Sequence, residues 1–252
     1  MNRTTVIGVA GLVLLSFFSF PAWASAVKTL GELALLPTYC RGVQGLRDIS
    51  KDPIPLNQYM QMYGESYGHL HHYCNALNTE NQAHMMFSKY DHDVALGSAL
   101  QDIQYVLKNS SPDFIFLPDI YNSQARILFE LHRDSEAVLS LEKAIELKPG
   151  YVPAIARLSD YFVHIGDREK AIKTLETGID NTENAGGLIK KLAALGVTYQ
   201  GKPGSAIKKD EPVNEATPAA SQDVANPSSS VPGDAVQAGS KPANNPYCRF
   251  CP

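Results

Sequence analysis

The chain has 252 residues and carries 22 Lys and Arg against 26 Asp and Glu, a formal net charge of −4 at pH 7. This balance leaves no basic field, so the composition argues against nucleic acid or an anionic lipid surface as a binding partner.

Residues 1–26 have the pattern of a secretory signal peptide. Arg3 precedes an uncharged apolar run that ends near Phe20, and small residues follow it. The run is shorter than the roughly 20 residues that a spanning helix needs, which disfavours the alternative of an uncleaved membrane anchor. We expect cleavage near Ala24 or Ala26, a periplasmic or secreted chain, and no stable membrane insertion after cleavage.

Residues 27–67 contain three prolines and several glycines, which interrupt any regular helix. This composition predicts an irregular N-terminal cap that packs against the helices after it. In residues 68–117, the apolar spacing between Leu96 and Leu107 predicts an amphipathic helix, preceded by a second helix over His72–Lys89.

Several histidines gather near the start of this helical pair. The segment Gly68–Cys74 contains three of them, and His84 and His92 follow. On a helix His69, His72 and Cys74 could approach one another, as zinc or copper ligands must, but their spacing matches no standard metal site. We favour a structural role in which imidazole and aromatic rings pack together, and we predict no cofactor.

A 34-residue repeat dominates residues 118–200. The run Ala137, Val138, Leu141, Ala144 and Ile145 recurs as Ala171, Ile172, Leu175, Gly178 and Ile179. Such spacing places each run on one stripe of a helix. It predicts helices over Asp119–His132 and Asp134–Leu147, a second antiparallel pair after Pro149, and a turn at Gly166-Asp167.

The ends of these helices carry their own signals. Asp134 and Asp167 are expected as N-caps, and Pro149 stops the first pair. A closing helix is predicted over residues 187–196. In that helix Ile189, Leu192 and Ala193 should face the core, and Lys190 and Lys191 should face water.

Residues 118–183 resemble two tetratricopeptide (TPR) repeats followed by a capping helix. The resemblance rests on the period, on the small residues Ala125, Ala137, Ala144 and Ala171, and on Gly166 and Pro149. The sequence departs from the family pattern at Tyr121, where tryptophan is usual, at Gly178, where alanine is usual, and near Glu183, where a closing proline is missing.

The resemblance implies an all-α, TPR-like helix-turn-helix solenoid with two clear repeats, a degenerate repeat at 68–117 and one capping helix. An unrelated helical pair is the alternative for residues 68–117. The histidine-rich segment 68–74 likewise resembles a motif of exported bacterial TPR proteins without assigned activity. In such folds the first helices of each pair line a groove for a partner protein. Carried over to this chain, the groove residues are Asn122, Arg126, Phe129, Arg157 and Asp160.

Residues 201–252 are rich in Pro, Ala and Ser and poor in large apolar side chains, which predicts a disordered tail. The tail closes on Tyr247-Cys248-Arg249-Phe250-Cys251-Pro252. We favour docking of Tyr247 and Phe250 into another protein, while a local Cys248–Cys251 disulfide or half of a shared metal clamp stays open.

The four cysteines, Cys40, Cys74, Cys248 and Cys251, fit an oxidising compartment and permit three pairings. We favour a Cys40–Cys74 bridge over free thiols. Such a bridge would link the cap covalently to the first helical pair. A disulfide that closes a loop of about 35 residues typically raises the free energy of unfolding by about 2–4 kcal/mol.

These features predict an exported scaffold that binds a protein or peptide partner of an envelope complex and has no catalysis of its own. No catalytic triad order or phosphate-binding loop is present in the sequence. The alternative is a thiol- or metal-handling maturation factor that uses Cys248, Cys251 and the histidines. Self-association through the end faces of the repeat stack is a further expectation.

Overall fold

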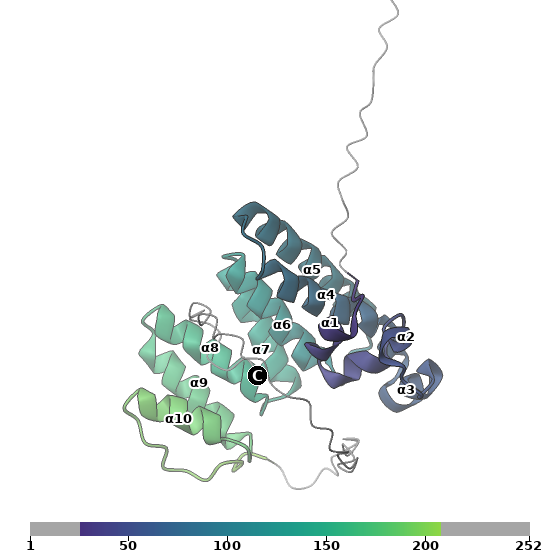
Figure 1. The fold of residues 1–252 in the computed structure, drawn as a ribbon. Helices are drawn as coiled ribbons and strands as arrows, with labels where there is room; N and C mark the ends of the chain where they lie inside the picture. The colour runs from purple at the N-terminus through teal and green to yellow at the C-terminus, as the bar shows by residue number, and fades with distance from the viewer. Residues whose placement is uncertain (1–25, 208–252) are drawn as a thin grey trace, which may run out of the picture. The chain divides into compact units, whose positions relative to one another are not determined.

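The computed structural model describes residues 26–207. Every regular element within this range is helical, as the sequence predicts (Figure 1). The chain forms two compact units, the first ending at Val106 and the second beginning at Leu107. Among residues 26–207, no helix combines the length and apolarity that a membrane crossing requires. The predicted signal sequence and most of the predicted tail lie outside the described residues.

The first unit begins with short helical pieces and continues into a long helical pair. Its elements are α1 (Leu30–Ala34), η1 (Thr38–Gly42), α2 (Arg47–Ser50), α3 (Leu56–Tyr63), η2 (Glu65–His69), α4 (Leu70–Ala83) and α5 (Lys89–Asn109). The prediction of one helix over His72–Lys89 is therefore wrong at its C-terminal end, because α4 ends at Ala83 and α5 begins at Lys89. The amides of Met85 and Met86 donate to the carbonyls three residues before them, which tightens the last turn of α4. The Ser88 hydroxyl accepts a hydrogen bond from the Asp91 amide at the start of α5.

The cap is tied to α4 by a covalent bond and by polar contacts. Cys40 of η1 and Cys74 of α4 form a disulfide with their Cα atoms 5.8 Å apart, the pairing that the sequence favours. Near the start of the cap, Gln82 donates to the Glu32 carboxylate at 3.0 Å. Glu32 also closes a capping box with Thr29, which fixes the first turn of α1.

A stack of tyrosines fills the space between α3 and η2. The ring of Tyr67 lies 5.1 Å from that of Tyr59 and 5.4 Å from that of Tyr63, centroid to centroid. A side chain at Gly42 would collide with Tyr59 and Tyr67, so glycine is needed for this close approach. The Tyr67 hydroxyl donates to the Tyr39 carbonyl at 2.8 Å, which satisfies the one polar atom of a buried ring.

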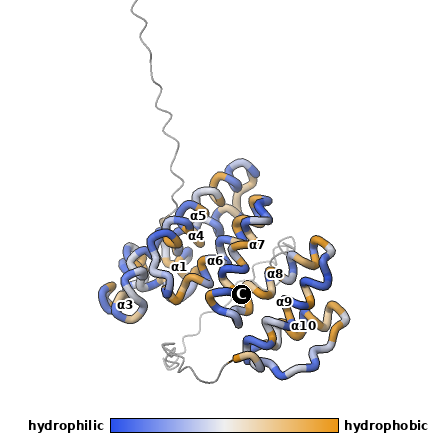
Figure 2. Tube along the Cα trace, turned by 180° about the vertical axis from the view of Figure 1, so that it is seen from behind, coloured by the Kyte–Doolittle hydropathy of each residue, from blue (hydrophilic) through white to orange (hydrophobic). Residues whose placement is uncertain are grey.

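The second unit consists of two helical hairpins and a closing helix, in the predicted order. Its elements are α6 (Leu117–Glu130), α7 (Asp134–Leu147), α8 (Val152–His164), α9 (Arg168–Asp180) and α10 (Gly186–Ala194). Figure 2 shows hydrophobic and hydrophilic positions alternating along α8 and α9, the pattern of helices with one buried stripe.

Small residues allow these helices to approach closely. Ala125, Ala137, Ala144 and Ala171 are fully buried. Gly178 goes further than alanine, since a Cβ there would lie 2.5 Å from Cγ2 of Ile155 and 3.2 Å from Cδ1 of Leu188. The departure from the family pattern at Gly178 thus has a steric reason in this chain.

The turns within the two hairpins differ although they stand one period apart. Gly166 has a φ of +79°, and His132, at the same place in the first hairpin, has a φ of +58°. Asp167 is the predicted N-cap and accepts from the Lys170 amide at 3.1 Å. The N-cap predicted at Asp134 is wrong, because the N-cap position belongs to Arg133, whose side chain makes no cap bond.

The end of the second unit corrects two predictions. Leu188 and Leu192 are the buried residues of α10, while Ala193 is exposed, because positions four apart share a face of a helix. Residues 201–207 belong to the fold and not to a disordered tail. The amides of Gly204 and Ala206 donate to the carbonyls of Ile179 and Asp180, at 3.0 and 2.8 Å, and so cap the end of α9.

Candidate partner-binding face

The residues predicted to line a groove all lie on α6 and α8 of the second unit. Asn122, Arg126 and Phe129 follow one another at helical spacing on α6, so they form a single stripe. Arg157 and Asp160 occupy α8. We call the surface formed by these residues, together with Tyr161 and Lys191, the first-helix face.

The side chain of Asn122 is largely buried and links α6 to α8. It is only 7% exposed, and its Oδ1 accepts from Nε of Arg157 at 3.3 Å. Arg157 is half-buried. Asn122 is therefore a positioning residue within the face, and less of its surface is open to a partner than the prediction implies.

An aromatic pair lies farther along the face. The rings of Phe129 on α6 and Tyr161 on α8 are 5.3 Å apart with planes inclined by 31°. Both side chains are half-buried. Partly exposed aromatic rings give a surface the large contact area that protein interfaces prefer.

An ion pair continues the face from α8 to α10. Nζ of Lys191 lies 2.6 Å and 2.8 Å from the two carboxylate oxygens of Asp160. The side chain of Lys191 is 21% exposed and that of Asp160 is 44% exposed. The expectation that Lys191 faces water is wrong, since α10 packs against α8 and brings its lysine to this carboxylate, whereas Lys190 is exposed as predicted.

Sequence reasoning missed Tyr161 and Lys191, although the repeat contains a signal for the lysine. Lys191 stands one 34-residue period after Arg157. Each of these cationic side chains bonds to the first helix of the preceding pair, Arg157 to Asn122 and Lys191 to Asp160. Aligning Lys191 with Arg157 by the 34-residue period would therefore have predicted that Lys191 contacts α8.

A half-buried carboxylate holds the first turn of α6 to the segment before α8. The Tyr151 hydroxyl donates to Oδ1 of Asp119 at 2.7 Å. Burial raises the pKa of Asp119 above its usual value, and the Tyr151 hydrogen bond opposes this rise.

The metal candidates of the first unit lie among aromatic rings. Cys74 is bonded to Cys40, so the trio His69, His72 and Cys74 is wrong as a ligand set. Nδ1 of His72 is 3.0 Å from Oδ1 of Asp102, and its ring lies 4.2 Å from that of Tyr105. The His69 ring packs edge-on against the same tyrosine at 5.7 Å.

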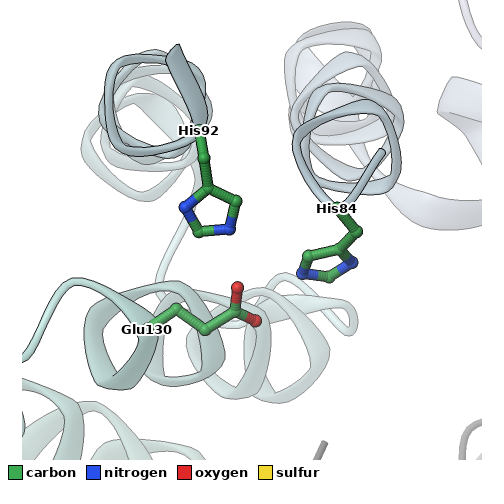
Figure 3. Close-up of side chains that lie close together, drawn as sticks. All are labelled: His84, His92 and Glu130. Carbon is green, nitrogen blue, oxygen red and sulfur yellow. The ribbon is translucent and has the colours of Figure 1, made fainter. Parts of the chain in front are cut away.

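Two further histidines lie at the turn between α4 and α5. Figure 3 shows His84 and His92 pointing to the same side, and their ring centroids are 6.1 Å apart. Nδ1 of His92 is 3.1 Å from Oδ1 of Asp93. Glu130, also labelled there, lies in the last turn of α6 and belongs to the second unit. Two imidazoles are fewer ligands than the four of a structural zinc site.

The remaining predicted residues, Tyr247, Cys248, Phe250 and Cys251, lie outside the described residues. The rival thiol- or metal-handling interpretation depends on them, and it loses Cys74 as a further sulfur ligand because that residue is in a disulfide.

Comparison with known proteins gave no match to this chain, whether with protein-family models, with curated proteins or with solved structures.

Proposed function

We propose that this chain is an exported, periplasmic scaffold of the TPR type. In this proposal the first-helix face of the second unit binds a protein or peptide segment of an envelope complex, and the chain has no catalytic activity. The observation that carries the proposal is the series of contacts between successive first helices. Asn122 pairs with Arg157, Phe129 with Tyr161, and Asp160 with Lys191.

These contacts support binding because they order a surface before a partner arrives. Side chains already held by neighbours lose less conformational entropy on association, so more of the contact energy appears as affinity. The face combines a partly exposed aromatic pair with both signs of charge. Such a mixture suits an extended or helical segment better than a single carboxylate, which would need several cationic side chains together.

Export is supported by the pattern of residues 1–26 and by the Cys40–Cys74 bond. Structural disulfides persist in oxidising compartments such as the bacterial periplasm.

The proposal is tested by site-specific photo-crosslinking in cells. A photoreactive aromatic residue replaces Phe129 or Tyr161 on the face, and Leu139, which lies on α7 and is 64% exposed, serves as the control position. We expect one envelope protein to crosslink at the first two positions and not at Leu139. That product should weaken at least fivefold when Tyr161→Ala is combined with the Phe129 probe.

Leu139→Ala should leave the same product unchanged, and circular dichroism should show equal helix content in both variants. Equal crosslinking from all three positions, or no loss in the Tyr161→Ala variant, would contradict a specific binding face.

A further inference from the structure

A pocket of about 430 Å³ lies among α7, α8 and α9 of the second unit, lined by none of the first-helix-face residues. Its apolar lining comes from Ile145 of α7, Ile155, Leu158 and Phe162 of α8, Pro149 and Gly178. Pockets of roughly 300–1,000 Å³ with apolar walls are the usual size for small ligands and for one or two anchoring side chains.

The backbone at Gly178 contributes to the apolar floor. Because this residue has no side chain, Ile155 packs directly on α9. The absence of a Cβ also leaves the apolar side chains of Ile145 on α7 and of Ile155, Leu158 and Phe162 on α8 facing one space. An aromatic ring entering this space would contact carbon atoms on several sides, an arrangement that favours burial of apolar surface.

The rim of the pocket is charged and offers two groups for pairing. Lys170 is engaged, since its Nζ lies 2.8 Å from the Asp167 carboxylate and 5.6 Å above the ring of Phe162. Glu142 and Lys173 are exposed, and within residues 26–207 neither makes an ion pair or a side-chain hydrogen bond. A ligand that brings an aromatic ring and a cation would match this rim, because Glu142 can accept the cation and Lys173 can lie over the ring.

One segment of this chain has that chemistry. Tyr247-Cys248-Arg249-Phe250-Cys251-Pro252 places an arginine between two aromatic residues. The preceding stretch, residues 208–246, contains no aromatic residue.

The distance from the last described residues to the pocket is short compared with the length of the chain that follows them. Gly204 and Ala206 hold the chain against the end of α9, and the pocket begins on the same helix at Gly178 and ends at Lys170. Ten helical residues separate Lys170 from Asp180, a distance of about 15 Å. The roughly 40 residues between Ile207 and Tyr247 can span up to ~130 Å, far more than this distance.

We propose that the segment Tyr247–Pro252 binds in this pocket of its own chain. Phe250 enters the apolar space between Ile155 and Phe162, and Arg249 pairs with Glu142. A linker of about 40 residues gives its end an effective concentration of about 1 mM at the pocket, so an intrinsic Kd of about 100 µM gives a bound to free ratio of about ten. The proposal assigns the tail a site on this protein and makes the pocket accessible only to ligands that displace it.

A single tryptophan can report on this contact. The one tryptophan of the sequence, Trp23, lies in the predicted signal peptide, so the mature chain with Phe250→Trp carries a single reporter at the proposed anchor. We expect emission shifted to shorter wavelength and protected from acrylamide, compared with a free hexapeptide of the same sequence. Both properties should be independent of protein concentration.

Charge exchange tests the specific pairing. Glu142→Lys should lower the bound to free ratio about fivefold or more, and adding Arg249→Glu should restore it. Glu169→Lys is the matched control, because Glu169 is an exposed acid on α9 that does not line the pocket. Circular dichroism checks that each variant is folded.

Several results would overturn the proposal. Emission and quenching equal to those of the free peptide would mean that the segment does not bind. Protection that rises with protein concentration would place the segment in a second copy. An equal effect of Glu142→Lys and Glu169→Lys would remove the proposed pairing.

Discussion

The two units of this protein are stabilised by different means. The first unit contains short helical pieces whose order depends on a disulfide, a capping box and a stack of tyrosines. The second unit contains hairpins with small residues at matching places of the repeat, and its described residues, 107–207, contain no disulfide. Helices of four or five residues are too short to be stable alone, whereas each hairpin buries a continuous apolar stripe against the next.

The comparison predicts that loss of the disulfide damages only one unit. Cys40→Ser with Cys74→Ser should destabilise the first unit by about 2–4 kcal/mol, because the bond closes a long loop. Hydrogen exchange should show faster exchange in α1, α3 and α4 and little change in α8 and α9. Equal loss of protection in both units would mean that the second unit depends on the first for its stability.

A steric change should damage the second unit. Gly178→Ala should cost about 1–3 kcal/mol, because its Cβ would collide with Ile155 in a packed core. Gly187→Ala is the matched control, since nothing lies within 4 Å of a Cβ built there and alanine favours a helix by about 0.5–1 kcal/mol. Thermal unfolding should move in opposite directions for the two variants, and movement in the same direction would contradict the close approach of α8 and α9.

The turns of the two hairpins offer a smaller and more specific test. His132 adopts the left-handed conformation that Gly166 adopts one period later. His132→Gly should therefore stabilise the second unit by about 0.5–1 kcal/mol, and Gly166→Ala should destabilise it by a similar amount. Chemical denaturation of both variants measures the difference. A loss of stability in His132→Gly would show that contacts of the histidine side chain stabilise the fold by more than its left-handed backbone conformation destabilises it.

The tyrosine stack gives the first unit a pH dependence in the alkaline range. Burial and the hydrogen bond to Asp52 raise the pKa of Tyr59 to about 12. The folded state thus keeps a proton that an unfolded chain loses near pH 10, so stability from Tyr59 is present below pH 10 and is lost as the pH rises towards 12.

Absorbance titration of tyrosinate in the native protein should detect this residue. Tyr59→Phe should remove one late-titrating tyrosine and leave the earlier transitions unchanged. Burial also raises the pKa of Tyr67, so the late transition should become smaller in Tyr59→Phe and not disappear. A late transition of unchanged size would contradict the raised pKa of Tyr59.

The sequence alone determined the helices of the second unit, because their signals are local. Apolar spacing, the turn at Gly166-Asp167 and the stop at Pro149 each act within a few residues, and they predicted α6 to α9 closely. It also favoured the Cys40–Cys74 bond, although cysteine counting left three pairings open.

The tertiary structure decided what spacing within one helix cannot show. Contacts of Lys191 with Asp160 and of Arg157 with Asn122 depend on how far one helix lies from the next. The pocket beside Gly178 likewise needs three helices in place, and residues 201–207 joined the fold because the end of α9 left carbonyl groups for them to bond. Hydrophobic periodicity identifies which face of a helix is buried, but the partner of each polar side chain on that face is set by packing between elements.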